Sequence, residues 1–358
     1  MTTLSAGVAI VGAGPVGLLL AGDLREAGVP VIVVERLPEP MTESRATQLT
    51  SRSASLLRAR GLESLLTDTE SKAHFGGLSF ELDSPLWKVP QPRTEAALTK
   101  RAFDLGVSLL RSHTLTGIGD HLEVDGPLGT VAIESEHVVG CDGENSTVRR
   151  LAGFDYAFRP ATRELLRADV TGLSVPDRRF ERFEHGLAVA ATRGDVTRVM
   201  VHEFGRSAAR TEPVTFAEIT DVWAKVTGED IAGGKPLWAD AFDNATGLVS
   251  SYREGNVLLA GDAAHRHLPV GGQALNVGLQ DAAALATALT GGADTLLDDY
   301  ARTRRAAALA VMELVAAQEL LLLGGPEVEP LREVLTELFT VDAARAHLAR
   351  AVEESGNS

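Results

Sequence analysis

The chain has 358 residues, of which 44% are hydrophobic and 23% are charged, a balance typical of one or two globular domains. Its 34 basic and 49 acidic residues give a formal net charge of -15, which argues against binding to nucleic acid or to an anionic membrane surface. The single cysteine, Cys141, excludes an intramolecular disulfide and a cysteine-based metal site. We therefore expect a protein of the reducing cytoplasm.

Two apolar stretches are long enough to raise the question of a signal peptide or a membrane span. Residues 6–20 follow no Lys or Arg and contain a glycine-rich turn, unlike a signal peptide. Residues 306–323 are interrupted by Glu313 and Glu319, which makes them too polar for a membrane span. We expect no membrane segment.

The first 35 residues predict one βαβ unit. Residues 8–11 form a continuous β-branched and apolar run, as expected of a strand buried on both faces. Residues 18–27 favour a helix that ends at Gly28, and residues 31–34 give a second buried strand ending at Glu35. Such a unit implies a parallel sheet.

After residue 35, the pattern of polar and apolar residues changes twice along the chain. Helices are expected at residues 52–60 and 94–105, with extended chain between them and short strands up to residue 139. From about residue 156 to 248, alternating polar and apolar residues predict antiparallel strands with one helix near residues 216–226. A buried strand at residues 257–260 and a mostly helical remainder follow. We predict a discontinuous nucleotide-binding domain, residues 1–155 and 249–358, around a substrate-binding sheet domain, residues 156–248, to which residues 72–93 contribute.

The first candidate binding loop is the sequence Gly12-Ala-Gly-Pro-Val-Gly17 between the first strand and helix. In such a loop Gly12 permits a tight turn, Gly14 lets the backbone approach a pyrophosphate, and Gly17 lets helix and strand pack closely. Glu35 is placed to accept hydrogen bonds from ribose hydroxyls, which favours a free 2′-hydroxyl over a 2′-phosphate. The alternative is a βαβ turn that binds nothing.

Two further loops follow predicted strands. Residues 140–149 contain Asp142 and Ser146, and on their own they equally suit an Asp-Gly turn with a helix cap. Residues 261–276 run from Gly-Asp262-Ala-Ala-His through Pro269 and Gly-Gly272-Gln to the start of an alanine-rich helix. Alone, this loop is compatible with another strand-to-helix crossover.

In this order, the three loops resemble those of the para-hydroxybenzoate hydroxylase-like flavin monooxygenases, in particular the hydroxylases of aromatic polyketides. Residues 74–78, 90–95 and 278–282 extend the resemblance over nearly the whole chain. It implies an α/β fold with a Rossmann-like (GR2-type) FAD-binding domain, an inserted, mainly antiparallel β-sheet substrate domain, and C-terminal helices.

The resemblance also implies a set of cofactor contacts. The glycine loop and Glu35 would hold the ADP half of non-covalent FAD, Asp262 the ribityl chain, and the amides near Leu275 the flavin ring, where they would stabilise its reduced, anionic form. No second glycine fingerprint for NAD(P)H is expected in this family. The residues carried over as cofactor-binding are Gly12, Gly14, Pro15, Val16, Gly17, Glu35, Arg36, Arg45, Gln91, Asp142, Asp262, Pro269, Gly272, Ala274, Leu275 and Asn276; Pro269 and Gly272 would lie beside the flavin, and no catalytic side chain is assigned.

Four features depart from the family pattern. The chain ends at Ser358, so the thioredoxin-like domain usual in polyketide hydroxylases is expected to be missing. Ala274 replaces a glycine and Gly247 stands where an arginine is usual. Ala284 stands where the pattern that begins at Asp281 usually has asparagine, and the Trp-Lys that usually follows Leu285 is missing. These changes leave FAD binding intact and put the redox activity in question.

Other candidate residues receive simpler interpretations. His265 and His267 lack a third ligand, so no metal site is expected. Cys141 is expected to be a buried, unreactive thiol, and Arg304-Arg305 to lie on a solvated helix face. Leucines 320–323 suit a core or a dimer contact. The aromatic residues proposed to line a substrate pocket are Phe183, Phe204 and Trp238.

The leading hypothesis is an NAD(P)H-dependent FAD monooxygenase that hydroxylates an aromatic or polyketide-type small molecule with O₂, as a monomer or homodimer. The alternative is an enzyme that retains FAD for structure and catalyses a non-redox step such as a cyclisation. A binding protein without catalysis is a third, weaker possibility.

Overall fold

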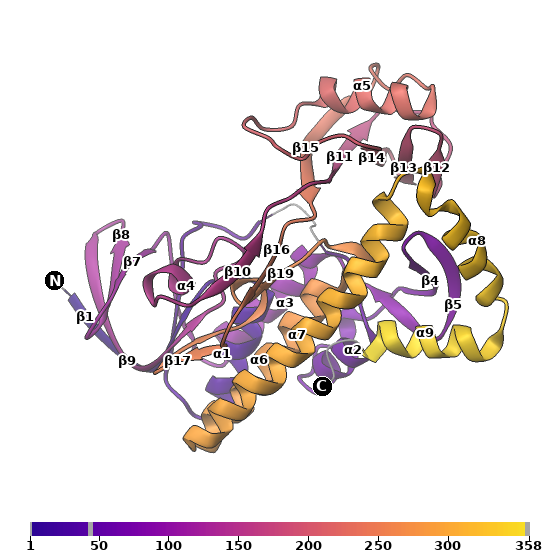
Figure 1. The fold of residues 1–358 in the computed structure, drawn as a ribbon. Coiled ribbons are helices and arrows are strands. Elements are labelled where there is room, and N and C mark those ends of the chain that lie inside the picture. The colour runs from indigo at the N-terminus through magenta and orange to yellow at the C-terminus, as the bar shows by residue number, and fades with distance from the viewer. Residues whose placement is uncertain (1, 42–45, 355–358) are drawn as a thin grey trace.

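The computed structural model describes residues 2–41 and 46–354. Its largest sheet is mostly parallel (Figure 1): β17, β18, β9, β1, β2 and β6 are neighbours in that order, and the antiparallel strands β7 and β8 extend it from β9. The strands are β1 (Thr2–Val11), β2 (Val31–Glu35), β6 (Ser108–Arg111), β7 (Thr114–Ile118), β8 (Leu122–Gly126), β9 (Gly129–Gly140), β17 (Arg253–Glu254) and β18 (Val257–Leu259).

Helix α1 (Pro15–Glu26) packs against this sheet, between α3 (Gln91–Asp104) and α6 (Gln273–Gly291). Its apolar residues Leu18, Leu19 and Leu20 are fully buried and join the main core with the strand residues on either side of it. On its polar side, Asp23 accepts hydrogen bonds from Arg60 and Arg101 and so ties α1 to its neighbours. The helices of this region are α1 (Pro15–Glu26), α2 (Ser51–Arg58), α3 (Gln91–Asp104), α4 (Thr147–Leu151) and α6 (Gln273–Gly291), with the short turn η1 (Glu63–Leu65).

Two crossing strands lead to a second sheet, which stands apart at the top of Figure 1. β10 and β16 pair antiparallel, with Tyr156 opposite Val249, so the chain leaves and returns through one ribbon. Between them lies a five-stranded sheet in the order β12-β13-β14-β11-β15, and α5 packs on one of its faces. The elements are β10 (Tyr156–Arg159), β11 (Glu164–Thr171), β12 (Arg178–Phe183), β13 (Gly186–Arg193), β14 (Val196–Glu203), α5 (Phe216–Thr227), β15 (Lys235–Asp243), β16 (Thr246–Val249) and β19 (His265–Arg266).

The C-terminal helices connect the two regions. α7 crosses the front of the molecule and reaches the second sheet, and α8 and α9 then surround a small three-stranded sheet of β3, β5 and β4 (Figure 1). The remaining elements are β3 (Gln48–Leu49), β4 (Thr69–Phe75), β5 (Leu78–Lys88), η2 (Gly261–Ala263), η3 (Val270–Gly272), α7 (Asp294–Leu323), η4 (Pro326–Val328), α8 (Glu329–Leu338) and α9 (Asp342–Glu354).

This architecture confirms the predicted fold class: a parallel sheet opened by a βαβ unit, an inserted antiparallel sheet, and C-terminal helices. The predicted ends of elements are less accurate. The first helix begins at Pro15, inside the glycine loop, rather than at residue 18, because proline fits the first position of a helix, where its missing N–H costs nothing.

Candidate functional site

The three glycine-containing loops lie side by side. They follow β1, β9 and β18, which are adjacent parallel strands, so all three leave the same edge of the sheet. Backbone hydrogen bonds link them: the Cys141 N–H donates to the Val11 carbonyl (2.7 Å), and the Ala260 N–H donates to the Gly140 carbonyl (3.0 Å). In open α/β sheets, ligands bind outside the carboxyl ends of the strands, so this edge is the candidate site.

The first loop has the geometry that phosphate binding requires. Gly12 has φ of +107°, and a Cβ there would lie 2.3 Å from the Cys141 carbonyl oxygen. A Cβ at Gly17 would lie 2.1 Å from the Gly12 oxygen, so helix and loop are in close contact. A Cβ at Gly14 would meet nothing within 4 Å, and α1 begins there without a side-chain cap. The loop is therefore closed on the protein side and open where an anion would approach the helix N-terminus.

Glu35 lies at the end of β2, next to this loop. Its carboxylate accepts hydrogen bonds from the Ala13 N–H (2.7 Å) and the Leu37 N–H (2.8 Å). These two bonds fix the side chain and leave further acceptor positions on a carboxylate that has about four. Glu35 is thus oriented by the backbone for the ribose contact expected from the sequence.

In the second loop, the structure shows the interactions of a helix cap. Asp142 accepts hydrogen bonds from the Ser146 hydroxyl (2.5 Å) and the Thr147 N–H (2.6 Å), and the Ser146 hydroxyl accepts one from the Arg149 N–H (2.9 Å). Arg149 in turn donates to the Ala263 carbonyl (2.7 Å) and so joins the second loop to the third. Asp142 therefore shapes the loop, whether or not it also contacts a ligand.

The third loop places Asp262 beside the first. Val16 packs against Gly261 and Gly278, where a Cβ would lie 3.1 and 2.7 Å from the valine side chain. Asp262 is exposed, yet its surroundings hold enough protein for desolvation, together with the nearby Glu144, to raise its pKa. Both properties are expected of a carboxylate that faces a space walled by protein, and such a group is well placed to accept hydroxyl hydrogen bonds.

The beginning of α6 is the second uncapped helix start at this edge. Gly272 is its N-cap, with φ of +68° and no side-chain hydrogen bond, and Gly271 before it has φ of +70°. Ala274 lies within the helix, and Ser112 and Phe180 are the described non-glycine residues with positive φ. Ala274 is therefore not in the left-handed region that favours glycine, and the alanine fits its position without strain.

Asn276 has a structural role in addition to its place at this helix start. Its side-chain oxygen accepts a hydrogen bond from the Thr50 N–H (2.9 Å), and its Nδ2 donates to the carbonyls of Gln48 and Gly272 (3.1 and 2.8 Å). The side chain is thus engaged by the protein and joins the segment at residues 48–50 to the start of α6.

The other residues expected to contact the cofactor differ in how exposed they are. Leu275 is half-buried in the first turn of α6, and Pro15 is buried in the first turn of α1. Pro269 and Arg36 are exposed, and Gln91 is half-buried at the first position of α3. Arg45 lies outside the described residues.

The sequence did not indicate the ion pair that is buried behind the third loop. Asp281 is fully buried and accepts hydrogen bonds from the Gly261 N–H (3.0 Å) and from Arg304 Nε (2.7 Å). Burial alone would raise the pKa of Asp281, but the charge of Arg304 and the hydrogen bond with His265 hold it below its usual value. The expected solvated position is wrong for Arg304: only its neighbour Arg305 is partly exposed. The local sequence contains no signal for the pair, because Arg304 lies in a charged stretch between Arg302 and Arg305.

Cys141 and the histidines form no reactive or metal-binding centre. Cys141 is half-buried rather than buried, but desolvation raises the pKa of its thiol, which keeps it protonated and unreactive. Burial lowers the pKa of His267 to about 4, and His265 next to it adds to the effect. Among the described residues, no group of three His, Cys, Asp or Glu side chains is arranged to hold a metal ion.

The inserted sheet separates the three aromatic residues proposed to line a pocket. Phe183 packs into the core beneath α5, on the face turned away from the FAD-binding region, so it is wrongly placed for a pocket there. Phe204 packs under Arg182, whose guanidinium lies 4.6 Å from its ring centre. Trp238 donates a hydrogen bond to Asp169 (3.1 Å) and lies on the sheet face that includes Phe242.

Phe180 is a better candidate that the sequence did not indicate. It has φ of +52° at a register shift in β12, and its ring packs 4.2 Å from that of His74. Burial lowers the pKa of His74 to about 4, with a contribution from Arg179. A bulky residue in a strained conformation is often found at a functional site. Phe180 also packs with apolar residues of the 268–270 loop and α7, which places it between the two regions.

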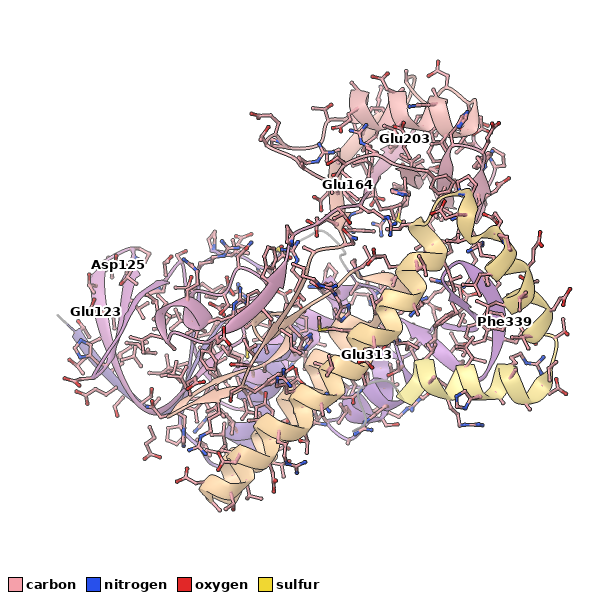
Figure 2. The ribbon with its side chains drawn as sticks, in the orientation of Figure 1. Glu123, Asp125, Glu164, Glu203, Glu313 and Phe339 are labelled. Atoms are coloured by element: carbon pink, nitrogen blue, oxygen red, sulfur yellow. The ribbon has the colours of Figure 1, made fainter. Side chains whose placement is uncertain are left out.

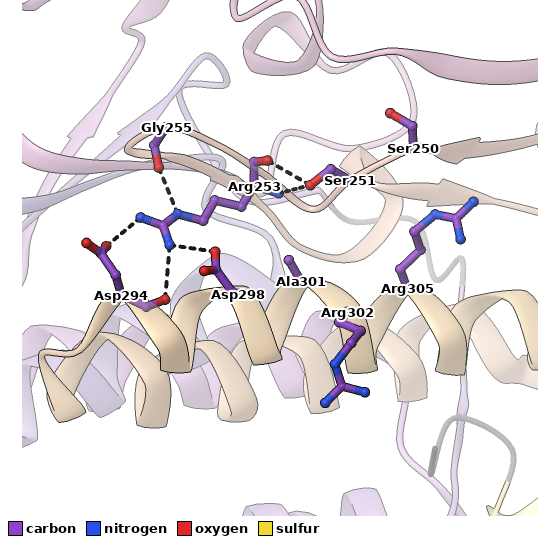
Figure 3. A pocket seen from close by; sticks show the side chains of 9 residues that line it. All are labelled: Ser250, Ser251, Arg253, Gly255, Asp294, Asp298, Ala301, Arg302 and Arg305. Carbon is purple, nitrogen blue, oxygen red and sulfur yellow. Dashed lines mark hydrogen bonds and ion pairs between the residues drawn. The ribbon is translucent and has the colours of Figure 1, made fainter.

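The two described cavities lie on another part of the surface. One, of about 700 Å³, is lined by polar and charged residues such as Arg253, Asp294 and Asp298 (Figure 3), and it adjoins one of about 500 Å³ that includes Phe158 and Leu309. Both border α7, and the glycine loops contribute to neither. The geometry of the three loops, rather than a cavity, therefore defines the candidate site.

A mostly parallel sheet with three linked loops at its carboxyl edge, two of them opening uncapped helices, defines a dinucleotide-binding protein. Residues 5–315 match the family described as FAD binding domain. The 12-dehydrotetracycline 5-monooxygenase/anhydrotetracycline 6-monooxygenase of Streptomyces rimosus is 36% identical over 96% of this chain and 75% of its own. The dialkyldecalin synthase of Streptomyces rugosporus is 34% identical over 96% of this chain and 79% of its own.

Among solved structures, CabE, an aromatic hydroxylase from angucycline biosynthesis, superposes with a TM-score of 0.90 at 41% identity, over 97% of this chain and 76% of that one. The chain thus spans about three quarters of the length of these relatives. It belongs to the FAD-binding domain family, and it is a FAD-dependent oxidoreductase of the monooxygenase type. The resemblance noted from the sequence is confirmed, including its cofactor, FAD.

Proposed function

We propose that FAD lies along the carboxyl edge of the parallel sheet and is held by all three loops. The single observation that carries this placement is that the loops follow three adjacent parallel strands and are joined by Arg149 and Val16. The pyrophosphate would approach Gly14 and the N-terminus of α1, and the adenosine ribose would be bound by Glu35. Asp262 would accept hydrogen bonds from the ribityl chain.

The flavin ring would lie at the start of α6. This helix begins at Gly272 without a side-chain cap, so the first backbone N–H groups, at residues such as Ala274 and Leu275, lack partners within the helix. Such donors, together with the positive end of the helix dipole, would stabilise negative charge on the reduced ring. Pro269 and Gly272 would border the ring, whereas Arg36, Gln91, Asp142 and Arg45 are proposed contacts with less support from the loop geometry.

The proposed reaction is hydroxylation of an aromatic or polyketide-type small molecule with NAD(P)H and O₂. When bound, FAD supplies the chemistry: it carries electrons from NAD(P)H to O₂, so that one oxygen atom enters the substrate. The chain's own part is to orient the ring and the substrate and to exclude water. The monooxygenases among the relatives support this reaction, and the apolar residues between the inserted sheet and α7 support an apolar substrate.

Anaerobic reduction tests this proposal. FAD-loaded protein is mixed with NADH or NADPH, with and without candidate phenols and polyketides, and flavin absorbance is followed. We expect reduction to accelerate with a correct substrate and, in air, NAD(P)H consumption to match the product formed. Flavin that is never reduced under any of these conditions would refute the redox function while leaving FAD binding intact.

A second candidate function has specific support from the dialkyldecalin synthase relative. In a synthase of this kind the chain would use the space beside FAD to fold and cyclise an extended polyketide. Product formation from a linear polyketide without NAD(P)H and in the absence of O₂ would favour it. Loss of that product on removal of FAD, with no change on reduction of FAD, would further show that the cofactor has a structural role.

Two further parts of the proposal concern organisation. We propose that residues 1–155 and 249–358 form the FAD-binding domain and residues 156–248 the substrate domain, because β10 and β16 form the paired ribbon that links the two sheets. Residues 72–93 would complete the substrate side through the turn at Gly77, against which Phe180 packs. We propose that the protein acts in the cytoplasm, with a small molecule rather than nucleic acid or a membrane as its partner.

A further inference from the structure

Gln48 places a polar side chain beside the start of α6. It belongs to the short strand β3, where its neighbour Leu49 is fully buried, and it lies opposite Lys88 in the antiparallel pairing with β5. Asn276 of α6 donates a hydrogen bond from Nδ2 to the Gln48 carbonyl (3.1 Å), and its side-chain oxygen accepts one from the Thr50 N–H (2.9 Å). The backbone of Gln48 is therefore fixed to the first turn of α6.

The side chain of Gln48 packs against the N-cap of that helix. A Cβ added to Gly272 would lie 3.1 Å from both Cβ and Oε1 of Gln48. The side chain is half-buried, and its amide forms no hydrogen bond within residues 2–41 and 46–354. A primary amide has two N–H donors and one acceptor oxygen. Gln48 thus holds these groups in a fixed place, next to an uncapped helix start, where a ligand can use them.

A second glutamine lies on the other side of the same turn. Gln318 is part of α7, shortly after Glu313, which Figure 2 labels on that helix. Gln318 is fully buried, and a Cβ on Gly271 would lie 3.4 Å from its Oε1. Neither amide atom of Gln318 has a partner in the part of the chain that the structure describes. Two consecutive glycines with positive φ are therefore each bordered by an unpaired amide, one enclosed by protein and one half-exposed.

The surroundings of Gln48 belong to the side of the molecule proposed for the substrate. Leu268 and Val270, just before the turn, pack in one apolar cluster with Phe180 of the inserted sheet. β3 is part of the small sheet whose β4–β5 turn, at Gly77, also packs against Phe180. Gln48 thus lies between the proposed position of the flavin ring and these apolar residues. In an apolar pocket, a few placed polar groups decide which ligand binds and how it is oriented.

We propose that Gln48 binds a hydroxyl group of the aromatic substrate and so sets which carbon atom of the ring faces the flavin. This assignment rests on the proposed hydroxylation, in which the backbone N–H groups of Ala274 and Leu275 already bind the polar edge of the flavin. The substrate hydroxyl donates a hydrogen bond to Oε1 of Gln48. Because β3 holds the amide in place and half withdraws it from water, this bond needs little further ordering or desolvation of the protein. A ring without the hydroxyl leaves the amide unpaired.

Equilibrium dialysis of the FAD-loaded, oxidised protein against 2-naphthol and 2-methylnaphthalene tests this role without NAD(P)H. The two probes have nearly the same shape, and only 2-naphthol has a hydroxyl group. We expect Gln48→Leu to shift the ratio of their dissociation constants by about fivefold or more in favour of 2-methylnaphthalene. A smaller shift, or a parent protein that binds neither probe, would overturn the assignment.

Gln318→Leu is the matched control, because it removes the enclosed amide on the other side of the turn. It should leave the ratio of the two dissociation constants unchanged. An equal shift in Gln318→Leu would show that the ratio depends on the packing of the turn, and it would also overturn the assignment to Gln48.

Two further measurements separate the substrate from the flavin. The FAD dissociation constant and the visible absorbance of Gln48→Leu should match those of the parent. A change in either, with an unchanged ratio for the probes, would place Gln48 against the flavin and refute its contact with the substrate. Because dialysis needs no flavin reduction, its result is independent of the proposed reaction. A protein that discriminates through Gln48 while its flavin is never reduced would refute the hydroxylation and keep the binding role of Gln48.

Discussion

The hydroxyl of Tyr156 fills the space beside Gly247: a Cβ on this glycine would lie 1.9 Å from the tyrosine oxygen. The two residues belong to the β10–β16 ribbon, and Arg149 packs over the same ring at 3.9 Å from its centre. The position of the ring thus explains why glycine fits here and a side chain would not. It also connects the ribbon to the second FAD loop, of which Arg149 is part.

The first prediction concerns this contact. Gly247→Ala should lower the free energy of unfolding by about 1–3 kcal/mol, because the new methyl group must displace the Tyr156 ring. In a Tyr156→Ala background, where the ring is gone, the same change should cost much less. Denaturant unfolding of the four proteins of this cycle measures the coupling. An equal cost in both backgrounds would show that the two side chains do not compete for the space.

The second prediction concerns FAD affinity. Asp262→Ala should weaken FAD binding roughly 10- to 100-fold, since a charge-assisted hydrogen bond contributes about 1.5–3 kcal/mol. The exposed Asp221 of α5 provides a control, and Asp221→Ala should leave the affinity unchanged. Fluorescence quenching of FAD added to the apoprotein gives both constants. If the two variants bind FAD alike, Asp262 does not contact the cofactor.

The third prediction separates the neighbours Arg304 and Arg305. Arg304→Gln should destabilise the protein by about 3–5 kcal/mol, because it leaves the buried carboxylate of Asp281 without its cation. It should also weaken FAD binding, since Asp281 holds the Gly261 N–H of the third loop. Arg305→Gln removes only a hydrogen bond to the Val249 carbonyl and should cost about 1 kcal/mol. Thermal unfolding with and without FAD compares them, and similar losses for both would contradict the buried-pair argument.

The sequence was most informative where a local rule has one physical solution. The loop at residues 12–17 needs glycine at three positions for three separate reasons, and the structure shows the close contacts behind two of them and open space at the third, Gly14. Glu35 could likewise be predicted, because it ends the strand next to that loop. The continuous apolar runs of β1 and β2 likewise predicted a parallel sheet, because strands buried on both faces are typical of one.

Long-range contacts could not be predicted in this way. Arg304 pairs with Asp281 across 23 positions, and nothing in its local sequence shows that its side of α7 faces the third loop. Phe183 and Phe180 lie three positions apart on the same short strand, so alternation places their rings on opposite faces of the inserted sheet. Which of these faces packs against α7 depends on contacts with a helix more than 100 positions away, and a local pattern cannot show it.

The fourth prediction concerns pH. The pKa of His74 is lowered to about 4, chiefly by burial, whereas in the unfolded chain it would be about 6.5. Between these values the unfolded chain binds a proton that the folded protein does not, so stability is full above about pH 6.5 and falls toward pH 4, by up to about 1.4 kcal/mol per pH unit.

Chemical unfolding between pH 7 and 4.5 measures this slope, a range in which Asp281 remains ionised because its pKa is lowered. His74→Asn keeps an acceptor for the Gly77 N–H and should reduce the slope, and a part should remain because the pKa of His267 is also lowered to about 4. The exposed His347 gives the control His347→Asn, which should leave it unchanged. An unaltered slope in His74→Asn would show that His74 titrates normally in the folded protein.

The last prediction asks whether Ala274 impairs flavin chemistry. Because Ala274 lies within α6 and without positive φ, Ala274→Gly should leave the rate of flavin reduction by NAD(P)H unchanged within about twofold. The matched variant is Gly272→Ala: its φ of +68° strains an alanine, and the new Cβ would lie 3.1 Å from Gln48. That strain, roughly 1 kcal/mol or more, should shift the start of α6, weaken the amide donors toward reduced flavin and slow reduction. Anaerobic stopped-flow absorbance and the flavin midpoint potential compare both variants with the parent. Faster reduction in Ala274→Gly would show that the alanine holds this flavin back, and it would move the balance toward the non-redox cyclisation.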